Sequence, residues 1–456
     1  MSSATDRWID AHRDEFLDDL IELLRIPSVN GASEPDAPFG REIRRALDFT
    51  MGLCRKFGLR TAQLDGKVGY TDWGQGAEML GILTHVDVVK ADGAWDTPPF
   101  TPTLKDGVLT ARGVQDDKGA VVASIYALAA VKACGLPFRR SVRLLFGCDE
   151  EQQMRGLAHY LSSGEPVPDL SFSPDAEFPV VNSEMHICSA EYSLSYPSSI
   201  TIQAGTAVNA VPGTACAYVP LSAEDSAVRS IHVPDGFQVH CTSQGIGCQI
   251  QVTGVPAHAC VPHLGKNALQ AMLCLLSHLP LPQEDRQALC ALADKFQMNY
   301  YGQGLGLERE DPSGRLTLNL GIMEWNASGY RLGIDLRVPT SMEQEQVRDT
   351  LDQALKGVAH RTAFRFSQGF YHSEDSELVS SLAEVFARRY GKRLPMVNMG
   401  GGTYARDLPN AVSFGPLMPG KADQCHVANE SMSLEDLFFN AKVIADAIEV
   451  LALEQG

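Results

Sequence analysis

The stretch MLGILTHVD, residues 79–87, joins a short apolar run to a histidine and an aspartate. The apolar part predicts a buried β-strand, and the two polar residues come at its end. Side chains two positions apart on a strand point the same way, so Asp87 can support the His85 imidazole or a metal bound to it. Taken alone, the pair fits a purely structural role equally well.

Similar polar motifs recur along the chain. They are QDDK at 115–118, DEE at 149–151, SPD at 173–175 and CH at 425–426. Together with His85 they supply the imidazole and carboxylate ligands that two divalent metal ions need, and they leave two carboxylates for chemistry. Their joint occurrence predicts a metallohydrolase.

Each motif also has a structural alternative. Asp116 and Asp117 fit the N-cap of a following helix. Asp175 fits a turn beside prolines. Glu150 and Glu151 fit an exposed loop tip, although adjacent glutamates at the end of a buried strand are costly unless they are paired or bind metal.

Strand and helix signals alternate in the first third of the chain. Strands are predicted at 79–83, 142–146 and 170–172, and helices at 8–25, 119–134 and 154–161. This alternation predicts an α/β domain with a mostly parallel mixed sheet and helices on both faces. Ligands of such sheets gather beyond the carboxyl ends of the strands, which is where the acidic motifs fall.

The pattern changes after about residue 184. Long alternating segments at 192–203, 238–254, 316–325 and 330–338 predict strands, with amphipathic helices at 267–279 and 341–355. Strands with a pair of helices on one face predict an inserted α+β domain of the ferredoxin-like, split βαβ kind. We therefore expect a discontinuous first domain, 1–186 and 373–456, around an insert at 187–372.

Composition limits the partners and the compartment. A chain of 456 residues is expected to form two domains. Its net charge of −18, from 38 basic and 56 acidic side chains, argues against nucleic acid or an anionic membrane as the main partner. The first 14 residues lack the apolar core of a signal peptide. The 11 cysteines, an odd number without a C-x-x-C pair, predict reduced thiols and a cytoplasmic protein.

At this point the motifs resemble those of a known family. The segments are GILTHVDVV at 81–89, WDTPPF at 95–100, ARGVQDDKG at 111–119, DEE at 149–151 and SPDAEFP at 173–179. They look like the signatures of the co-catalytic zinc metallopeptidases of clan MH (peptidase family number 20), which include glutamate carboxypeptidase, acetylornithine deacetylase, succinyl-diaminopimelate desuccinylase and aminoacylase. The likeness covers nearly the whole chain in the right order, and it is greatest to the bacterial dipeptidase V type. It implies a zinc-exopeptidase-like catalytic domain.

The resemblance also implies a role for each motif residue. Asp116 would bridge two zinc ions, or manganese or cobalt in their place. His85 and Asp175 would complete the coordination of one ion, and Glu151 and His426 would complete that of the other. Glu150 would be the general base and acid, Asp87 would orient His85, and the peptide bond after Asp116 would be cis.

The predicted insert carries further matches. GVPAH at 254–258 with GKNA at 265–268 resembles the family's lid motif, in which His258 would stabilise the oxyanion of the tetrahedral intermediate; alone, it would be read as a surface loop residue. AGTAVN at 204–209 and DLR at 335–337 resemble segments whose Asn209 and Arg337 hold the terminal carboxylate of the substrate. The alternative for Arg337 is a charge at a strand edge. GGGT at 400–403 lacks the lysine of a P-loop, so Gly401 is expected to let backbone approach the substrate.

These matches predict a zinc-dependent dipeptidase acting on short peptides with a free amine. Asp175 is the residue that the family's dipeptidases and aminopeptidases carry, whereas deacylases and carboxypeptidases tend to carry Glu. An N-acyl amino acid deacylase is the alternative of the same chemistry, and a catalytically silent peptide or metal binder is the alternative of another class. Cys260 near His258 and Cys425 beside His426 depart from the pattern. The family implies a monomer or a homodimer formed through the lid.

Overall fold

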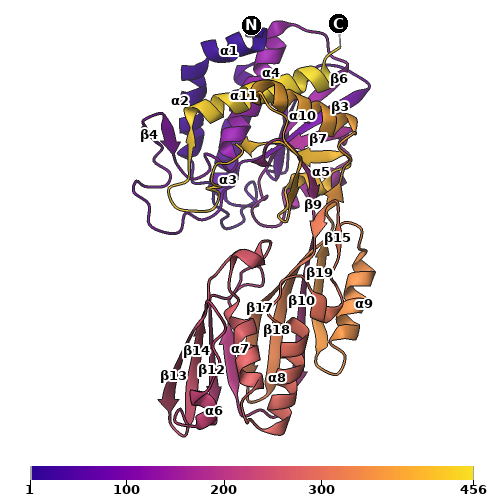
Figure 1. The fold of residues 1–456 in the computed structure, drawn as a ribbon. Coiled ribbons are helices and arrows are strands. Elements are labelled where there is room, and N and C mark those ends of the chain that lie inside the picture. The colour runs from indigo at the N-terminus through magenta and orange to yellow at the C-terminus, as the bar shows by residue number, and fades with distance from the viewer. Residues whose placement is uncertain (1–2, 455–456) are drawn as a thin grey trace. The chain divides into compact units, whose positions relative to one another are not determined.

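The computed structural model describes residues 3–454, which divide into two compact units. Within this range the first unit contains residues 3–183, 372–397 and 402–454, and the second contains 184–371 and 398–401 (Figure 1). The segment 398–401, which the sequence analysis assigned to the first domain, lies with the second unit. The short strands β20 (Phe370–Tyr371) and β21 (Val397–Met399) lie where the chain passes from one unit to the other.

The first unit is built on a mixed sheet with the strand order β1-β2-β6-β3-β7-β22-β9. The strands are β1 (Arg60–Leu64), β2 (Val68–Trp73), β3 (Glu78–His85), β6 (Arg140–Gly147), β7 (Leu170–Ser173), β9 (Val181–Glu184) and β22 (Ala411–Ser413). The four central strands β6, β3, β7 and β22 pair in parallel, and the outer strands pair antiparallel. The expected mixed α/β fold is confirmed, with parallel pairing at its centre.

Helices cover this sheet. They are α1 (Ala4–Ala11), α2 (Arg13–Leu24), α3 (Arg41–Lys56), α4 (Lys118–Cys134), α5 (Arg155–Ser162), α10 (Glu377–Tyr390) and α11 (Leu434–Ala452). Helix α4 is apolar all round because it packs between α11, the N-terminal helices and the sheet. The single helix expected at 8–25 is wrong: it is two helices that meet at His12, whose ring stacks on Trp8 with centroids 3.8 Å apart.

Two small sheets join the C-terminal part of the chain to earlier segments of the first unit. Strand β24 (Ser431–Ser433) pairs with β5 (Val108–Thr110), which also pairs with β4 (Thr103–Lys105). Strand β23 (Pro416–Leu417) pairs in parallel with β8 (Ala176–Glu177). A short 3₁₀ helix, η3 (Tyr404–Asp407), precedes β22. The loop between β23 and β24 is thereby held at both ends.

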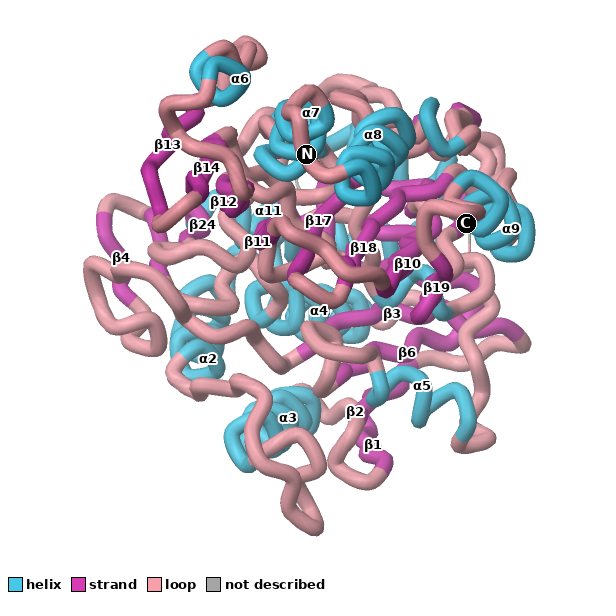
Figure 2. Tube along the Cα trace, turned by 90° about the horizontal axis from the view of Figure 1, so that it is seen from below, coloured by secondary structure: helices cyan, strands magenta, loops and turns pink. Residues whose placement is uncertain are grey.

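The second unit is an antiparallel sheet with the order β13-β14-β12-β11-β17-β18-β10-β19 (Figure 2). Its strands are β10 (His186–Ser195), β11 (Thr201–Ala204), β12 (Thr214–Val219), β13 (Gln238–Gln244), β14 (Gly247–Thr253), β17 (Thr317–Asn326), β18 (Gly329–Val338) and β19 (His360–Ser367). Helices α7 (Ala268–Ser277) and α8 (Gln283–Phe296) share an apolar core with the sheet, and α9 (Gln344–Ala354) packs on β19. The remaining short elements are α6 (Ser226–Arg229), η1 (Pro262–Leu264), η2 (Gln303–Leu305), β15 (Glu310–Asp311) and β16 (Gly314–Arg315).

Three expectations for this region were incomplete. The segment 192–203 is not one strand, because Pro197 separates β10 from β11. The segment 238–254 is a hairpin, β13 and β14, that turns at Gly245 with a positive φ of 61°. Helix α8 was missed because it starts with five polar residues and its only large apolar side chains are Leu289, Leu292 and Phe296, which are buried. Among residues 3–454, no helix is both long and apolar enough to span a bilayer.

Candidate metal centre

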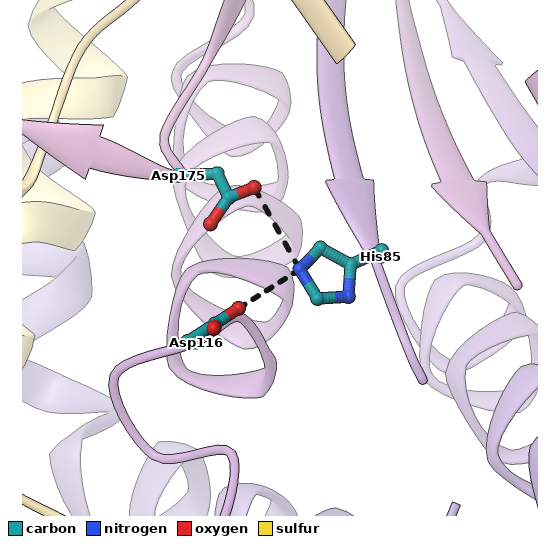
Figure 3. Close-up of side chains that lie close together, drawn as sticks. All are labelled: His85, Asp116 and Asp175. Atoms are coloured by element: carbon teal, nitrogen blue, oxygen red, sulfur yellow. Dashed lines mark hydrogen bonds and ion pairs between the residues drawn. The ribbon is translucent and has the colours of Figure 1, made fainter. Parts of the chain in front are cut away.

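His85 ends strand β3, and its ring is fully buried. Its Nε2 lies 3.0 Å from Asp116 Oδ1 and 3.7 Å from Asp175 Oδ2. Both carboxylates therefore point at the same ring nitrogen, as Figure 3 shows. The other nitrogen, Nδ1, lies 2.9 Å from the carbonyl oxygen of Asp87, which sets the ring orientation.

Asp116 also faces a second histidine. Its Oδ2 lies 2.9 Å from His426 Nε2, which in turn is 3.0 Å from Glu151 Oε2. The side chains thus form two sets of candidate ligands. The His85 group is His85, Asp116 and Asp175, and the His426 group is Asp116, Glu151 and His426. In each group every residue offers one ligand atom, and these atoms all lie within 4.8 Å of one another. Asp116 belongs to both groups.

The fold explains why residues so distant in sequence meet here. His85 is the last residue of β3, and Glu151 and Asp175 follow β6 and β7. The carboxyl ends of these three parallel strands lie at one edge of the sheet. Asp116 lies in the turn between β5 and α4, and His426 lies in the loop between β23 and β24. The peptide bond between Asp116 and Asp117 is cis, which confirms that prediction.

Two further aspartates hold the backbone of this site. The carboxylate of Asp87 accepts hydrogen bonds from the N–H groups of Glu150 and Glu151, each at 3.2 Å. Its Oδ1 is 3.5 Å from His85 Nδ1, farther than its own carbonyl oxygen. Asp117 accepts a hydrogen bond from the N–H of His85 at 3.0 Å. Asp87 therefore supports both the imidazole and the glutamate pair.

The charges in the site are crowded. Burial disfavours the charged ring of His85, but hydrogen bonds to Asp116, Asp175 and Asp87 outweigh it and raise its pKa well above the usual range. Burial and the charge of Asp116 raise the pKa of Glu151 to about 7. Both shifts favour the protonated forms of His85 and Glu151, in a place where bound cations would replace the protons.

Glu151 provides the most direct test of whether a metal fits. Its Oε2 faces His426, but its Oε1 is buried without a hydrogen-bond partner in the protein. A buried carboxylate oxygen without a partner costs folding free energy, and a bound divalent cation would serve as that partner. Imidazole nitrogens and carboxylate oxygens are a donor set that zinc, manganese and cobalt accept. The residues present fit the predicted ions.

Glu150 is in neither group. Burial and the negative charge of Asp175 raise its pKa well above the usual value for a glutamate. A glutamate beside the candidate ligands that is not itself one of them is a candidate for proton transfer.

The remaining predicted residues lie in the second unit. Arg337 on β18 donates from Nε to Asp335 Oδ1 at 2.9 Å and from Nη2 to Asp335 Oδ2 at 3.2 Å. Its Nη1 donates to the carbonyl oxygen of Gly400, next to Gly401, at 2.5 Å. These bonds engage three of its nitrogens and leave N–H groups on Nη1 and Nη2 for another acceptor.

His258 and Asn209 lie side by side in the same unit. The carbonyl oxygen of Asn209 accepts from the N–H of Ala259 at 2.9 Å, directly after His258. The Nδ1 of His258 is 2.8 Å from Cys260 Sγ and accepts the N–H of Cys260 at 3.3 Å. Sequence reasoning noted Cys260 only as an unusual neighbour, and its contact with His258 depends on how this loop folds.

Sequence reasoning missed Glu430 entirely. Its side chain is fully buried, and it accepts hydrogen bonds from the segment that carries Asp116. Glutamate four residues after His426 gives no local signal, because its partners lie more than 300 residues earlier in the chain.

Comparison with known proteins agrees with the geometry. The family model described as Peptidase family M20/M25/M40 matches residues 81–450. The chain belongs to this peptidase family. This peptidase is accordingly a hydrolase, a metallopeptidase of the kind that the motifs predicted.

Relatives of this family member are similar over nearly their full length. A protein of Bacillus subtilis (strain 168) named "Putative dipeptidase YtjP" is 33% identical, and the match covers 96% of this chain and 98% of that protein. A Staphylococcus haemolyticus protein named "Putative dipeptidase SH1171" is 29% identical over 98% of this chain and 99% of its own.

Solved structures share the fold. Human carnosine dipeptidase 1 matches with a TM-score of 0.59 and 16% identity over 98% of each chain. The aminoacylhistidine dipeptidase of Vibrio alginolyticus matches with a TM-score of 0.61 and 13% identity, over 96% of this chain and 97% of that one. At these identities the likeness concerns the fold.

Proposed function

We propose that this peptidase is a dinuclear zinc dipeptidase that cleaves dipeptides, or short peptides with a free amino terminus. The observation that carries the proposal is the position of Asp116, whose two carboxylate oxygens face two different histidines at 3.0 and 2.9 Å. A carboxylate shared in this way is what two ions acting on one water molecule require.

Residues of the first unit would divide the chemistry between them. When bound, two divalent cations lower the pKa of a water molecule so that hydroxide forms near neutral pH. Glu150 accepts the proton of that water as the oxygen forms its bond to the carbonyl carbon of the substrate. The same carboxyl group then delivers the proton to the leaving amine as the carbon–nitrogen bond breaks. The raised pKa of Glu150 favours the first step, because it makes the carboxylate a stronger base towards the proton of the water.

The second unit, residues 184–371 with 398–401, would act as a ferredoxin-like lid, close to the insert predicted at 187–372 between the catalytic segments 1–186 and 373–456. Its antiparallel sheet with α7 and α8 supports this assignment. In this proposal His258 donates a hydrogen bond to the oxyanion. Asn209 and Arg337 bind the terminal carboxylate of the substrate, and Gly401 lets backbone approach it. The contacts of Asn209 with the His258 loop and of Arg337 with the 398–401 segment support a common role.

The choice of dipeptides and of zinc rests on chemistry and on relatives. Two relatives that cover nearly the whole chain are named as dipeptidases. Asp175 lies in the His85 group, where the resemblance associates Asp with dipeptidases and aminopeptidases. Zinc suits imidazole and carboxylate ligands, as do manganese and cobalt. All 11 cysteines are free, which supports the proposed cytoplasmic location.

A substrate panel with two variants tests the proposal. Dipeptides, tripeptides and N-acetyl or N-succinyl amino acids are assayed with zinc, manganese or cobalt. Dipeptides are expected to be cleaved fastest, and Glu150→Gln is expected to keep its metal while losing activity by about 10²–10⁴-fold. Glu449→Gln is the matched control, since Glu449 is a half-buried glutamate that accepts from Thr5 and belongs to neither ligand group.

Three results would contradict parts of the proposal. Faster release of acetate or succinate would identify a deacylase. Unchanged turnover in Glu150→Gln would remove it as the base. Absence of any metal-dependent cleavage would indicate a silent binder.

A further inference from the structure

Glu430 lies directly before β24, and its side chain is fully buried. Its Oε2 accepts hydrogen bonds from Arg112 Nη1 at 2.7 Å and from the N–H of Gly113 at 2.9 Å. Its Oε1 accepts from the N–H groups of Gln115 at 2.8 Å and of Asp116 at 3.2 Å. All four donors belong to the turn at 112–116, which ends on the candidate shared ligand.

These four bonds make the turn and the carboxylate dependent on each other. A buried carboxylate is stable only when donors replace its hydration, and here every donor comes from this one short turn. Displacing the turn would break several charge-assisted bonds at once. The backbone of Asp116 is therefore held by Glu430, not only by the turn itself.

The same turn is joined to the other side of the His426 loop. The Nε2 of Gln115 donates to Asp423 Oδ1 at 2.8 Å and lies 3.0 Å from Cys425 Sγ. Asp423 and Cys425 precede His426 in the chain, and Glu430 follows it. Strand β24 then pairs with β5, so that Ser431 lies opposite Thr110. The turn that carries Asp116 thus contacts the loop that carries His426 on both sides of the histidine.

We propose that Glu430 is a positioning residue for the metal centre. It fixes the main chain of Asp116 so that one carboxylate oxygen faces His85 and the other faces His426. The inference rests on the proposed function, because it takes Asp116 to be the shared ligand. Groups behind the ligands of a metal site set ligand orientation, and their loss typically weakens metal binding by about 10–100-fold.

Titration of the full-length, metal-free protein with Co²⁺ tests this role. Glu430→Gln keeps the shape but presents an amide NH₂ group to backbone N–H donors. It is expected to bind Co²⁺ about 10–100-fold more weakly and to change the Co²⁺ absorption spectrum, which reports ligand geometry directly. Glu430→Asp keeps the carboxylate but shortens the side chain by one methylene group. We expect this variant to lose Co²⁺ affinity too, but by less than Glu430→Gln.

Asp72→Asn is the matched control. Asp72 on β2 accepts from Arg143 at 2.7 and 2.8 Å, so this variant also removes a carboxylate from an arginine of the first unit. It is expected to keep the wild-type Co²⁺ affinity and spectrum, and an equal loss in it would overturn the proposal as a general stability effect.

Wild-type affinity and spectrum in folded Glu430→Gln would overturn the proposal as well. If that variant does not fold, unchanged Co²⁺ binding by Glu430→Asp would do so. Failure of the wild-type protein itself to bind Co²⁺ would instead contradict the proposed function. This outcome differs from those that contradict only the role of Glu430.

Discussion

The two ligand groups share Asp116 but are held in different ways. In the His85 group the imidazole side chain is fully buried, and the Asp175 side chain is 13% exposed. In the His426 group the imidazole side chain is 55% exposed. One group is therefore enclosed by the protein, and the other is open to solvent on the side of its histidine.

The difference follows from the elements that carry the two histidines. His85 ends a central strand, its N–H is bonded to Asp117, and its ring contacts the carbonyl oxygen of Asp87. His426 lies in a loop, with a positive φ of 64° that few non-glycine residues adopt. The sheet therefore provides one preformed group, whereas the loop provides a second group that depends on its neighbours. We expect the ion of the His426 group to exchange faster.

The largest effect is expected from removing what the groups share. Asp116→Ala should abolish binding of both ions and reduce peptidase activity to the level of buffer, because each group would keep only two ligands. Metal content after dialysis and dipeptide hydrolysis measure the two effects, with circular dichroism as the control for folding. One retained ion per chain would show that the two groups bind metal independently, without sharing Asp116.

The two histidine variants separate the groups. His426→Ala should bind one ion instead of two and lose activity by on the order of a hundred-fold or more. His85→Ala should also destabilise the metal-free protein, by about 1–3 kcal/mol, because it leaves buried carboxylates without their partner. Metal stoichiometry and urea unfolding measure these outcomes. Equal unfolding free energies in the two variants would contradict the difference in enclosure.

The stability of the metal-free protein should depend on pH through the His426 group. Burial and the charge of Asp116 raise the pKa of Glu151 from 4.5 to about 7, and hydrogen bonds to Asp116 and Glu151 raise that of His426 from 6.5 to about 11. Below pH 4.5 Glu151 contributes nothing to the free energy of unfolding. Between pH 4.5 and about 7 it increasingly destabilises the folded protein, because its carboxyl group loses its proton in the unfolded chain first. His426 stabilises fully below pH 6.5, and that contribution is lost as the pH rises towards 11.

Metal-free protein should therefore melt at progressively lower temperature as the pH rises from 4.5. The metal-loaded protein should not show this fall, because Glu151 and His426 are already deprotonated when they bind metal. The gap between the two melting curves should widen with pH. Thermal melts with zinc and with chelator at several pH values measure it. Parallel curves would count against metal binding by Glu151 and His426.

The smallest effect is expected from Asp87→Asn. The amide keeps one acceptor oxygen for the N–H groups of Glu150 and Glu151 and loses the negative charge near His85. Activity should fall by about 10-fold, which is at the lower end of the effects seen for residues that hydrogen-bond to metal ligands. Steady-state kinetics at saturating zinc measure it, with Asp72→Asn as the control. A loss as large as that of Glu150→Gln would mean that Asp87 takes part in proton transfer.

The sequence alone predicted much of this site, because its signals are local. Apolar runs followed by His85, Glu151 or Asp175 predicted strands that end in ligands, and these residues do meet at one edge of the sheet. The motifs also named the family and the cis bond after Asp116, both confirmed. The roles of these residues stay predictions.

Only the tertiary structure revealed how the site is held together. Glu430 forms its bonds to a turn 314 residues earlier in sequence, and no periodicity or local propensity encodes such a pairing. The enclosure of His85 and the exposure of His426 likewise depend on what packs around each ring. Local patterns determine which residues end a strand, whereas the neighbours that fix and shield them are chosen by long-range packing.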